Sequence, residues 1–461
     1  MSRNFVLLLA TIFISAAIFC AAVSAQTSVT YHIWNTDNLP NSSTIEKYYR
    51  YLSRPDDAPT NQLGLYQVVP TLGGNGGYYI SDDDGYYVYY GADNQSEIVL
   101  HNDDSTLKNQ TFGIGGYYYY YDDYYYEDIN RTTVTVQSDT LGVLRTMTAT
   151  NAPLFNVWNN AQLTISSDII VSKKEDEGSS TGYYGAIYLQ SGQLNAQNVL
   201  FSSCLGIYNN SYGGAITSYG YYDYYGVNSV INVDGARFIG NKANSGGAIY
   251  LYQNNILNGN RTVFDGNSAN RYGGALSLYN STATLENATF TNNTVDYGSG
   301  YGYNYYGGAI YAANSNLYLK GTNFTSNNAA GLGGAIYFEI NDSGSYALEL
   351  GAFQGTSVEF AGNKQNYDSI NYTGNANSIT FTSSATGIVN VAVDVEGNNN
   401  NFNMRDPMAV YGGNLRFTKS GEGAWNLYGI SNLSYASGVL FNIDRGTFRL
   451  GDNAELYMTG G

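Results

Sequence analysis

Cysteine, proline and basic residues are all scarce in this sequence. Its 461 residues include 2 cysteines and 6 prolines, and Cys20 lies in an apolar N-terminal stretch, which leaves Cys204 alone in the remainder. A single thiol excludes an internal disulfide. Lys and Arg total 20 against 37 Asp and Glu, for a net charge of −17. This balance excludes nucleic acid as a partner, because phosphate contacts need clustered Lys and Arg.

The sequence also lacks the motifs of catalytic and metal sites. Its two histidines, His32 and His101, lie outside the repeated part of the chain, and no Gly-x-Ser-x-Gly, His-Glu-x-x-His or P-loop pattern occurs. Acidic clusters at 82–84, 122–123 and 127–128 have glycine nearby, and such carboxylates can bind calcium. Their spacing matches neither an EF-hand loop nor the nonapeptide calcium repeat, which favours solvated loops. We expect no catalytic residue, no metal site and no cofactor.

The N-terminus has the three parts of a secretory signal peptide. Arg3 supplies the positive charge, residues 5–19 form an apolar segment, and Val-Ser-Ala at 23–25 is a small-residue cleavage site. Lipoprotein processing at Cys20 is the weaker alternative, because a bulky residue precedes it. Residues 1–25 are therefore predicted to direct export, and no later apolar run is long enough to span a bilayer.

Two short phrases return along the middle of the chain. The stretch "NSGGAIYLYQNNILNGNRTVFDGN" at residues 244–267 contains both: Gly-Gly-Ala-Ile, and then Phe-x-x-Asn. The two alternate strictly over residues 181–363, with worn copies at 184–187 and 201–204 at the beginning. Consecutive phenylalanines are 26 residues apart where no extra loop intervenes, as at Phe238, Phe264 and Phe290. Alternation at a fixed period indicates a solenoid with one coil per pair of phrases.

The residues between the phrases have the period of β-strands. After the Gly-Gly at 246–247, Ile249 and Leu251 face one way and Tyr250 and Tyr252 the other. Gly, Asn and Ser are frequent throughout, which disfavours helices and suits turns. The chain is therefore predicted to be all-β, a right-handed parallel β-helix with coils of about 26 residues and inserted loops.

Each repeated residue type has a structural role in such a coil. Gly-Gly permits a corner with positive φ and close backbone approach, Phe forms an inward stack, and Asn occupies a turn where its amide can bond to the Asn of the next coil. The predicted repeat residues are Gly213, Gly214, Phe238, Asn241, Gly246, Gly247, Phe264, Asn267, Gly273, Gly274, Phe290, Asn293, Gly307, Gly308, Phe324, Asn327, Gly333, Gly334, Phe360 and Asn363.

These paired phrases resemble the repeats of the polymorphic outer membrane proteins, a chlamydial family of autotransporters. A second resemblance lies near the end, where "FTKSGEGAWNLYG" (417–429) and "GTFRLG" (446–451) are similar to the autotransporter-associated repeat. The resemblance implies a β-helix passenger that reaches the cell surface through an outer-membrane barrel. No barrel pattern is present in this sequence, so we expect either that the barrel lies outside it or that the protein is released or attached in another way.

The chain is divided into four segments on these grounds. Residues 1–25 are the signal peptide, and 26–130 are an N-terminal cap region with a Tyr-rich low-complexity stretch. Residues 131–377 form the β-helix with the paired repeats, and 378–461 form further β-helix coils. We see no Pro- or Gly-rich linker that would divide the solenoid.

Other features leave alternatives open. The chain has 48 Tyr, many in the stretches 117–126, 219–225 and 297–306, which suit contact with sugars or proteins but also fit compositional drift in solvated loops. Asn-x-Ser/Thr sequons are explained by composition unless the source glycosylates its exported proteins. Cys204 is either a packed turn residue or a reactive thiol.

The expected function is binding rather than catalysis. We expect an exported protein at the cell surface, in the outer membrane or outside the cell, that acts as an adhesin or surface antigen on a protein or glycan ligand of a host or neighbouring cell. The alternative is a secreted β-helix enzyme that cleaves polysaccharides by hydrolysis or elimination, because carboxylates from different coils could meet across a groove. No binding residue is assigned from the sequence.

Overall fold

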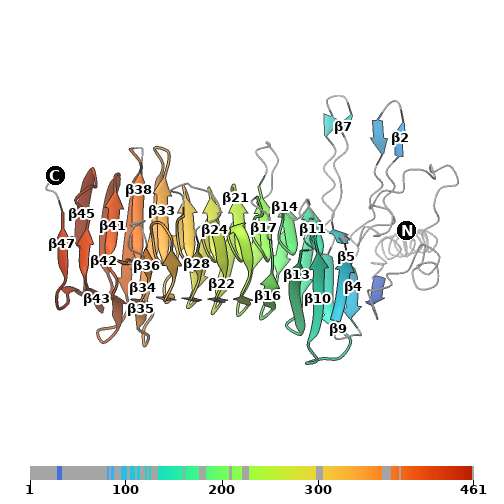
Figure 1. Ribbon diagram of the computed structural model, residues 1–461, viewed down its shortest axis with the longest axis horizontal. Helices are drawn as coiled ribbons and strands as arrows, with labels where there is room; N and C mark the ends of the chain where they lie inside the picture. The colour runs from blue at the N-terminus through green and yellow to red at the C-terminus, as the bar shows by residue number, and fades with distance from the viewer. Residues whose placement is uncertain are drawn as a thin grey trace, which may run out of the picture.

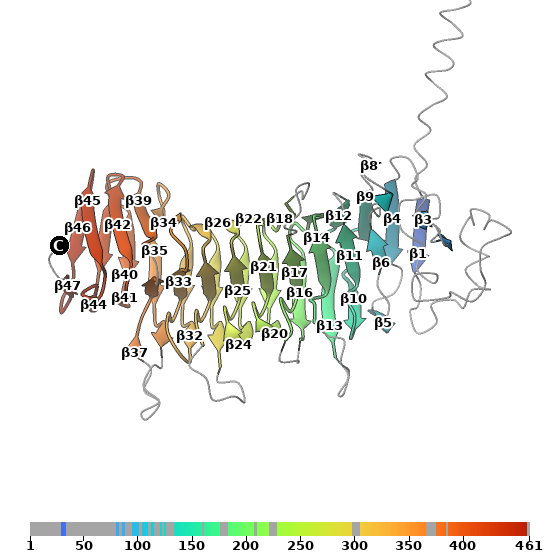
Figure 2. The same ribbon diagram turned by 90° about the horizontal axis from the view of Figure 1, so that it is seen from above.

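Every regular element in the described part of the protein is a β-strand. The computed structural model describes residues 133–458, apart from 159–160, 176–182, 207–209, 221–227, 297–304, 366–374 and 384–385, and eight strands between residues 29 and 125. These strands form three long sheets, which we name sheets 1 to 3, a smaller sheet 4, and two hairpins. All pairing within the three long sheets is parallel, as in Figures 1 and 2.

Each long sheet contains strands from successive coils, in chain order. Sheet 1 contains β1 (Val29–Ile33), β4 (Gln95–Leu100), β9 (Thr133–Ser138), β12 (Gln162–Ile165), β15 (Gln193–Asn195), β18 (Val230–Asn232), β22 (Ile256–Asn260), β26 (Thr282–Glu286), β30 (Asn316–Tyr318), β34 (Ser345–Ala352), β39 (Ile388–Val395), β42 (Asn414–Ser420) and β45 (Gly438–Ile443). Sheet 2 contains β5 (Asp104–Lys108), β10 (Arg145–Thr150), β13 (Ile169–Lys174), β16 (Leu200–Cys204), β19 (Arg237–Ile239), β23 (Val263–Asp265), β27 (Thr289–Thr291), β31 (Asn323–Thr325), β35 (Val358–Ala361), β40 (Asn401–Met404), β43 (Ala424–Leu427) and β46 (Thr447–Leu450). Sheet 3 contains β6 (Phe112–Ile114), β11 (Phe155–Trp158), β14 (Ile187–Gln190), β17 (Ile216–Tyr219), β21 (Ile249–Tyr252), β25 (Leu276–Tyr279), β29 (Ile310–Ala313), β33 (Ile336–Ile340), β38 (Ile379–Ser383), β41 (Met408–Tyr411), β44 (Ile430–Asn432) and β47 (Glu455–Tyr457).

Sheet 4 and the hairpins are short. Sheet 4 contains β20 (Lys242–Ser245), β24 (Ser268–Tyr272), β28 (Thr294–Val295), β32 (Asn328–Ala329), β36 (Lys364–Gln365) and β37 (Asn375–Ala376), of which only the last pair is antiparallel. The hairpins are β2 (Ile80–Asp82) with β3 (Gly85–Tyr87), and β7 (Tyr120–Tyr121) with β8 (Tyr124–Tyr125).

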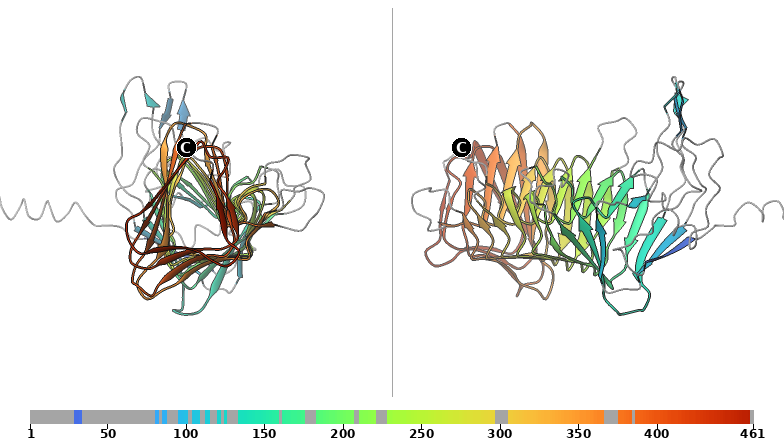
Figure 3. Two further views of the ribbon diagram at one scale, coloured as in Figure 1. Left: turned by 90° about the vertical axis from the view of Figure 1, so that its left-hand side faces the viewer. Right: turned by 45° about the vertical axis from the view of Figure 1, so that its right-hand side comes forward.

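The chain path makes this assembly a parallel β-helix, as the sequence predicts. In the repeat region one coil visits sheet 1, sheet 2, sheet 4 and sheet 3 in turn, for example through β22, β23, β24 and β25. The view along the long axis in Figure 3 shows the sheets surrounding a common interior. Sheet 4 is an additional feature that the sequence pattern does not predict. The right-handed sense of the coiling stays a prediction.

The predicted segments 26–130 and 378–461 share the sheets of the repeat region. Strand β4 pairs with β9 in register, β5 pairs with β10, and β6 pairs with β11, so part of the predicted cap region contributes strands to the solenoid. At the other end β39 pairs with β34 over eight residues, and β42 and β45 follow. The three sheets are therefore continuous across both predicted boundaries.

The core consists of rows of side chains that lie one coil apart. Alternation along each strand places one set of side chains inside, and Ile249 and Leu251 are both fully buried there as expected. Parallel pairing in register puts the same position of successive coils about 4.8 Å apart. One such row contains Phe155, Ile187, Ile216, Ile249, Leu276, Ile310, Ile336, Ile379 and Met408.

The two glycines of each pair have different roles. Gly246 has a φ of 63°, in the left-handed region that favours glycine. Gly247 is required for space instead, because a Cβ there would lie 2.1 Å from the carbonyl oxygen of Gly274 and 2.4 Å from that of Ser268. The corner can therefore turn and also stack closely on the next coil.

The phenylalanines of the repeat form a continuous stack in sheet 2. Their rings are buried and nearly parallel from Phe201 to Phe324, with centroids 4.5 to 4.9 Å apart. Phe360 continues the stack at 4.6 Å with a tilt of 34°. Offset aromatic contacts of this kind contribute about 0.5–1.5 kcal/mol beyond area burial.

A ladder of buried asparagines runs beside the phenylalanines. Asn267 donates its side-chain amide to Asn293 Oδ1 at 2.9 Å and to the carbonyl oxygen of Phe238 at 3.0 Å, and its Oδ1 accepts from Asn241. Its backbone N–H also donates to Asn293 Oδ1, at 3.1 Å. The same bonds recur from Asn241 to Asn363 with amide-to-amide distances of 2.9 Å. Each asparagine thus links its own coil to both neighbours.

The ladder has a direction, and different residues occupy its two ends. In every asparagine of the ladder, one amide N–H donates to the side chain of the following coil. The last asparagine therefore needs a neighbour that accepts this hydrogen bond and has no N–H of its own that would need a partner. Asp406 is that acceptor: Oδ2 accepts from the Asn363 amide at 3.0 Å, and Oδ1 accepts from the Gly362 N–H at 3.1 Å. At the beginning, the Cys204 backbone N–H donates to Asn241 Oδ1, and its thiol lies 3.5 Å from the Val171 carbonyl oxygen.

Replacement of one ladder residue tests its energetic role. Asn267→Ala removes the acceptor of Asn241 and the donor to Phe238 at a buried site, and we expect the free energy of unfolding to fall by about 1–3 kcal/mol. Asn270→Ala is the matched control, because Asn270 is partly exposed and its side chain makes no hydrogen bond within the described part of the chain. Equal unfolding midpoints for the two variants in a urea titration would contradict the ladder's role.

Two glycine variants compare the cost of lost space with the cost of a left-handed backbone conformation. Gly247→Ala places a methyl group against two backbone carbonyls, and we expect it to destabilise the fold by about 3 kcal/mol. Gly266 has a φ of 63° but no atom within 4 Å of a built Cβ, so Gly266→Ala should cost only about 1 kcal/mol. The measurement is urea unfolding followed by circular dichroism, and the reverse order of the two effects contradicts this assignment.

Candidate functional site

The predicted repeat residues lie in the corners and interior of the coils. The phenylalanines and asparagines are fully buried, and the glycines form the corners between sheets 4 and 3. The structure brings these residues into rows along the solenoid axis, where they hold coils together. A candidate binding site has to be sought on the outer surface instead.

Tyrosines cover the outer face of sheet 3. Tyr250, Tyr311 and Tyr337 point outward, as the strand period predicts, yet they are only 4–5% exposed. The segments that precede the glycine corners cover them, with Tyr272 and Tyr306 packed against the same cluster. The rings of Tyr306 and Tyr337 stack with centroids 4.2 Å apart. These tyrosines therefore form a second, smaller core and are not free for a partner.

Burial controls the ionisation of this tyrosine cluster. It raises the pKa of Tyr219, Tyr250, Tyr279, Tyr311 and Tyr337 above the usual value for tyrosine, and neighbouring phenols and Glu339 add to the effect. The phenol of Tyr311 donates a hydrogen bond to Glu339. The cluster is neutral and internally bonded, which fits a packing role.

Cys204 is a packed core residue in the structure. It is fully buried at the end of β16, and burial raises its pKa from 9.0 to about 12 against the opposing effect of Lys173. Reactive cysteines require exposure and a lowered pKa. The geometry thus supports the packed-residue alternative over the reactive thiol.

Several charged residues of the described part form ion pairs. Lys320 Nζ lies 2.5 Å from Asp394 Oδ2 and 2.5 Å from Glu396 Oε1, and it lies 4.9 Å from the centre of the Phe353 ring. The described residues contain no group of three His, Cys, Asp or Glu side chains that could hold a metal ion. The Lys320 ion pairs link its coil to the coil of β39, and the lysine offsets one of the two negative charges.

Several predicted features lie outside the described residues. The side chains of His32 and His101 and of the acidic clusters at 82–84, 122–123 and 127–128 belong to this group. So do most of the Tyr-rich stretches at 117–126, 219–225 and 297–306. The expectations that the sequence gives for these residues therefore stay predictions.

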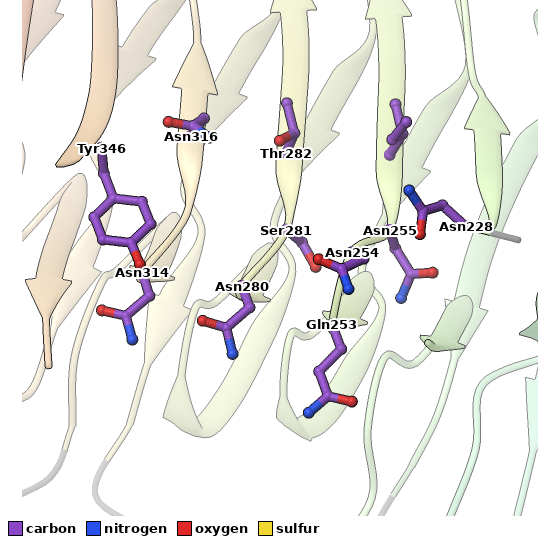
Figure 4. A pocket seen from close by; sticks show the side chains of 11 residues that line it. Asn228, Gln253, Asn254, Asn255, Asn280, Ser281, Thr282, Asn314, Asn316 and Tyr346 are labelled. Atoms are coloured by element: carbon purple, nitrogen blue, oxygen red, sulfur yellow. The ribbon is translucent and has the colours of Figure 1, made fainter. Parts of the chain in front are cut away.

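A polar groove lies on the described surface of the solenoid. It has a volume of about 510 Å³ and crosses several coils at the turns that lead from sheet 3 to sheet 1. Figure 4 shows amide side chains succeeding one another from coil to coil along these turns, with Tyr346 at one end and Asn228 at the other. The lining residues are Asn228, Gln253, Asn254, Asn255, Ile256, Asn280, Ser281, Thr282, Asn314, Asn316 and Tyr346.

The local sequence explains why amides gather at this groove. Asn254, Asn280 and Asn314 follow strands of sheet 3 with φ values of 55°, 47° and 46°. Asparagine is among the few residues other than glycine that adopt this left-handed conformation readily. The turns of these three coils therefore each carry an asparagine side chain on the same side of the solenoid.

The groove is uncharged and rich in unused hydrogen-bonding groups. None of its lining residues is Asp, Glu, Lys, Arg or His. The side chains of Asn254 and Asn280 make no hydrogen bond within the described residues, and the buried Nε2 of Gln253 has no partner there. Asn314 Oδ1 accepts from the Asn341 N–H at 2.8 Å. The Tyr346 phenol donates to Asp342 Oδ2 at 2.6 Å, which fixes its ring.

The groove could not be recognised from the sequence, although one signal was present. Asparagine follows a sheet 3 strand in three coils, directly in "YNS" at 279–281 and "ANS" at 313–315, and after one further residue in "QNN" at 253–255. The phrases are short, and asparagine is frequent throughout the chain. Only the register of sheets 3 and 1 shows that they form one surface.

Thiol reactivity provides a test of the core assignment. In a Cys20→Ser variant, we expect Cys204 to resist Ellman's reagent at pH 8 until guanidinium chloride unfolds the protein, because burial keeps the thiol protonated and inaccessible. The contribution of this raised pKa to stability is complete below the pKa of the unfolded thiol, 9.0, and is lost as the pH rises toward about 12. Rapid labelling of the native protein at pH 8 would show that Cys204 is accessible.

Comparison with known proteins identifies the repeat. The family model for the Chlamydia polymorphic membrane protein repeat matches residues 235–252 and 287–313. These ranges include a glycine corner, a phenylalanine of the stack and an asparagine of the ladder in each case, at Gly246, Phe238 and Asn241 in the first range and at Gly307, Phe290 and Asn293 in the second.

The family assignment rests on the repeat and on the coil that it builds. Neither the curated proteins nor the solved structures include a chain that matches this one. Within the described residues, no helix has the length and apolar character needed to cross a membrane. The coils of this chain thus carry the repeat of the Chlamydia polymorphic membrane protein family.

Proposed function

We propose that this protein is the passenger part of an autotransporter, displayed outside the cell as a β-helix shaft that acts by binding and not by catalysis. The observation that carries the proposal is the coincidence of the family repeat with the corner, stack and ladder that build the shaft. The adhesin or antigen role, the signal peptide at 1–25 and anchorage through an outer-membrane barrel are parts of this proposal.

The separation of shaft and loops supports a binding role. The insertions at 221–227, 297–304 and 366–374 fall between strands, and the strands on both sides keep their register with neighbouring coils. In a solenoid each coil contacts only its neighbours, so a loop can change without loss of the coil beneath it. Such a shaft can present variable surfaces to a host or neighbouring cell.

The chemistry of the described residues also favours binding over catalysis. The carboxylates of Asp394 and Glu396 are paired with Lys320, and Glu339 accepts from the Tyr311 phenol. A glycoside hydrolase needs two carboxyl groups that face a substrate groove, whereas the amide groove has none in its lining. The enzyme alternative is tested by incubating the purified protein with polysaccharides and measuring new reducing ends or unsaturated products, of which we expect none above the level of a buffer control.

Surface display is the first property to measure. Antibody to residues 181–363 should label intact source cells, and protease treatment of intact cells should remove the label while a cytoplasmic control protein survives. Purified protein should also bind to host or neighbouring cells in a saturable manner and compete with the source cells for them. Label that requires permeabilised cells, or the absence of saturable binding, would contradict the proposal.

A further inference from the structure

We propose that the polar groove between sheets 3 and 1 binds an uncharged oligosaccharide that lies along the solenoid axis. This inference deepens the proposed binding function and rests on it, because it names the class of ligand and the residues that hold it. The groove spans the turns of successive coils, from Asn228 to Tyr346, so a ligand bound there contacts more than one coil.

The free amides are the first argument. The Asn254 and Asn280 side chains are exposed and make no hydrogen bond within the described part of the chain, although a carboxamide offers both donors and an acceptor. A sugar hydroxyl also donates and accepts, so an amide can either donate a hydrogen bond to it or accept one from it. Asn254, Asn280 and Asn314 lie on three successive coils about 4.8 Å apart along the axis, and they provide a row of such contacts for a chain of hexose rings.

The absence of charge in the lining is the second argument. The whole chain carries a net charge of −17, yet none of the groove residues has an ionised side chain at neutral pH. An anionic glycan would find no Lys or Arg there, and a cationic ligand would find no carboxylate in the lining. The groove therefore selects neutral polar ligands by hydrogen bonding alone.

The backbone at the turns distinguishes a sugar from a peptide. The N–H of Asn254 donates to the carbonyl oxygen of Asn280, and the N–H of Asn280 donates to that of Ala313. These main-chain groups are used between coils, so an extended peptide cannot pair with them as an added strand. Recognition has to use the side-chain amides, which suits hydroxyl groups.

Two residues complete the groove. The Tyr346 ring is fixed by the bond of its phenol to Asp342 and borders one end, where it can pack on the apolar face of a sugar. Gln253 contributes a buried Nε2 that has no partner within the described residues. Rotation about χ3 of Gln253 would turn this N–H toward a ligand oxygen. The new hydrogen bond would remove the free-energy cost of a buried donor without a partner.

Titration of the purified protein with defined oligosaccharides tests the inference. The neutral probes are cellohexaose, maltohexaose, mannohexaose and chitohexaose; the comparison probes are an oligogalacturonate and a neutral hexapeptide. We expect at least one neutral hexasaccharide to bind in isothermal titration calorimetry, and neither comparison probe to bind at the groove. In Asn254→Asp/Asn280→Asp, the affinity should fall by about tenfold or more, because two amide donors are lost and two charges are added.

The variants are chosen to keep the turns intact. Aspartate is isosteric with asparagine and tolerates the left-handed conformation, and Asn453→Asp is the matched control because Asn453 is exposed with a φ of 62° in a turn between β46 and β47, far from the groove residues in sequence. Its affinity should equal that of the wild type. Tyr346→Ser is an independent variant that should weaken binding by loss of the ring face, should the double variant fail to fold.

Several results would overturn the inference. They are binding of only the oligogalacturonate or the peptide, no binding of any neutral hexasaccharide, or an affinity that the groove variants leave unchanged. A wild-type protein that still binds cells in a saturable manner but binds no neutral glycan would refute the glycan groove and leave the proposed function standing. A protein that binds neither cells nor glycans would refute both.

Discussion

The stacking of identical side chains one coil apart is the constraint on which the rest of this structure depends. Asn267 bonds to the preceding coil through Phe238 and Asn241 and to the following coil through Asn293. A slip of one residue would break these bonds and turn a phenylalanine of the stack outward, because side chains alternate along a strand. The register is therefore fixed at every coil, and this explains why the two phrases recur while the residues between them vary.

A directional ladder also needs a defined beginning and end. Asparagine supplies a donor and an acceptor, which suits the interior of the ladder. At the last position an amide would leave its own donor unpaired in a buried site, whereas the carboxylate of Asp406 accepts from Asn363 without requiring a further partner. Burial raises the pKa of Asp406, and its bonds to Asn363 and Gly362 act against that effect. The departure from the repeat at Asp406 thus follows from the chemistry of the ladder.

The periodic part of the structure could be predicted from the sequence because each coil repeats the same constraint. Gly246, Phe264 and Asn267 occupy positions that only a few residue types satisfy, so their spacing reveals the coil directly. The burial of Tyr311 could not be predicted in the same way, since it depends on covering segments that belong to other positions of the coil. The amide groove escaped prediction for a related reason: its residues come from turns in several coils and meet only through the register of two sheets.

The same constraint separates the parts of the molecule that can change from those that cannot. Substitution of Gly247 is restricted by backbone atoms of the next coil, whereas Asn254 and Asn280 extend from the turns with no partner within the described residues. A change at a turn residue alters the surface of one coil and leaves the buried rows intact. The side chains of Asn254 and Asn280 make no hydrogen bond within the described residues, so packing of the coils does not explain why these residues are asparagine. The left-handed backbone accounts for the choice of asparagine over most residues but not over glycine, which adopts the same conformation more readily. The uncharged ligand that we propose for the groove would give these side chains a role beyond the turn.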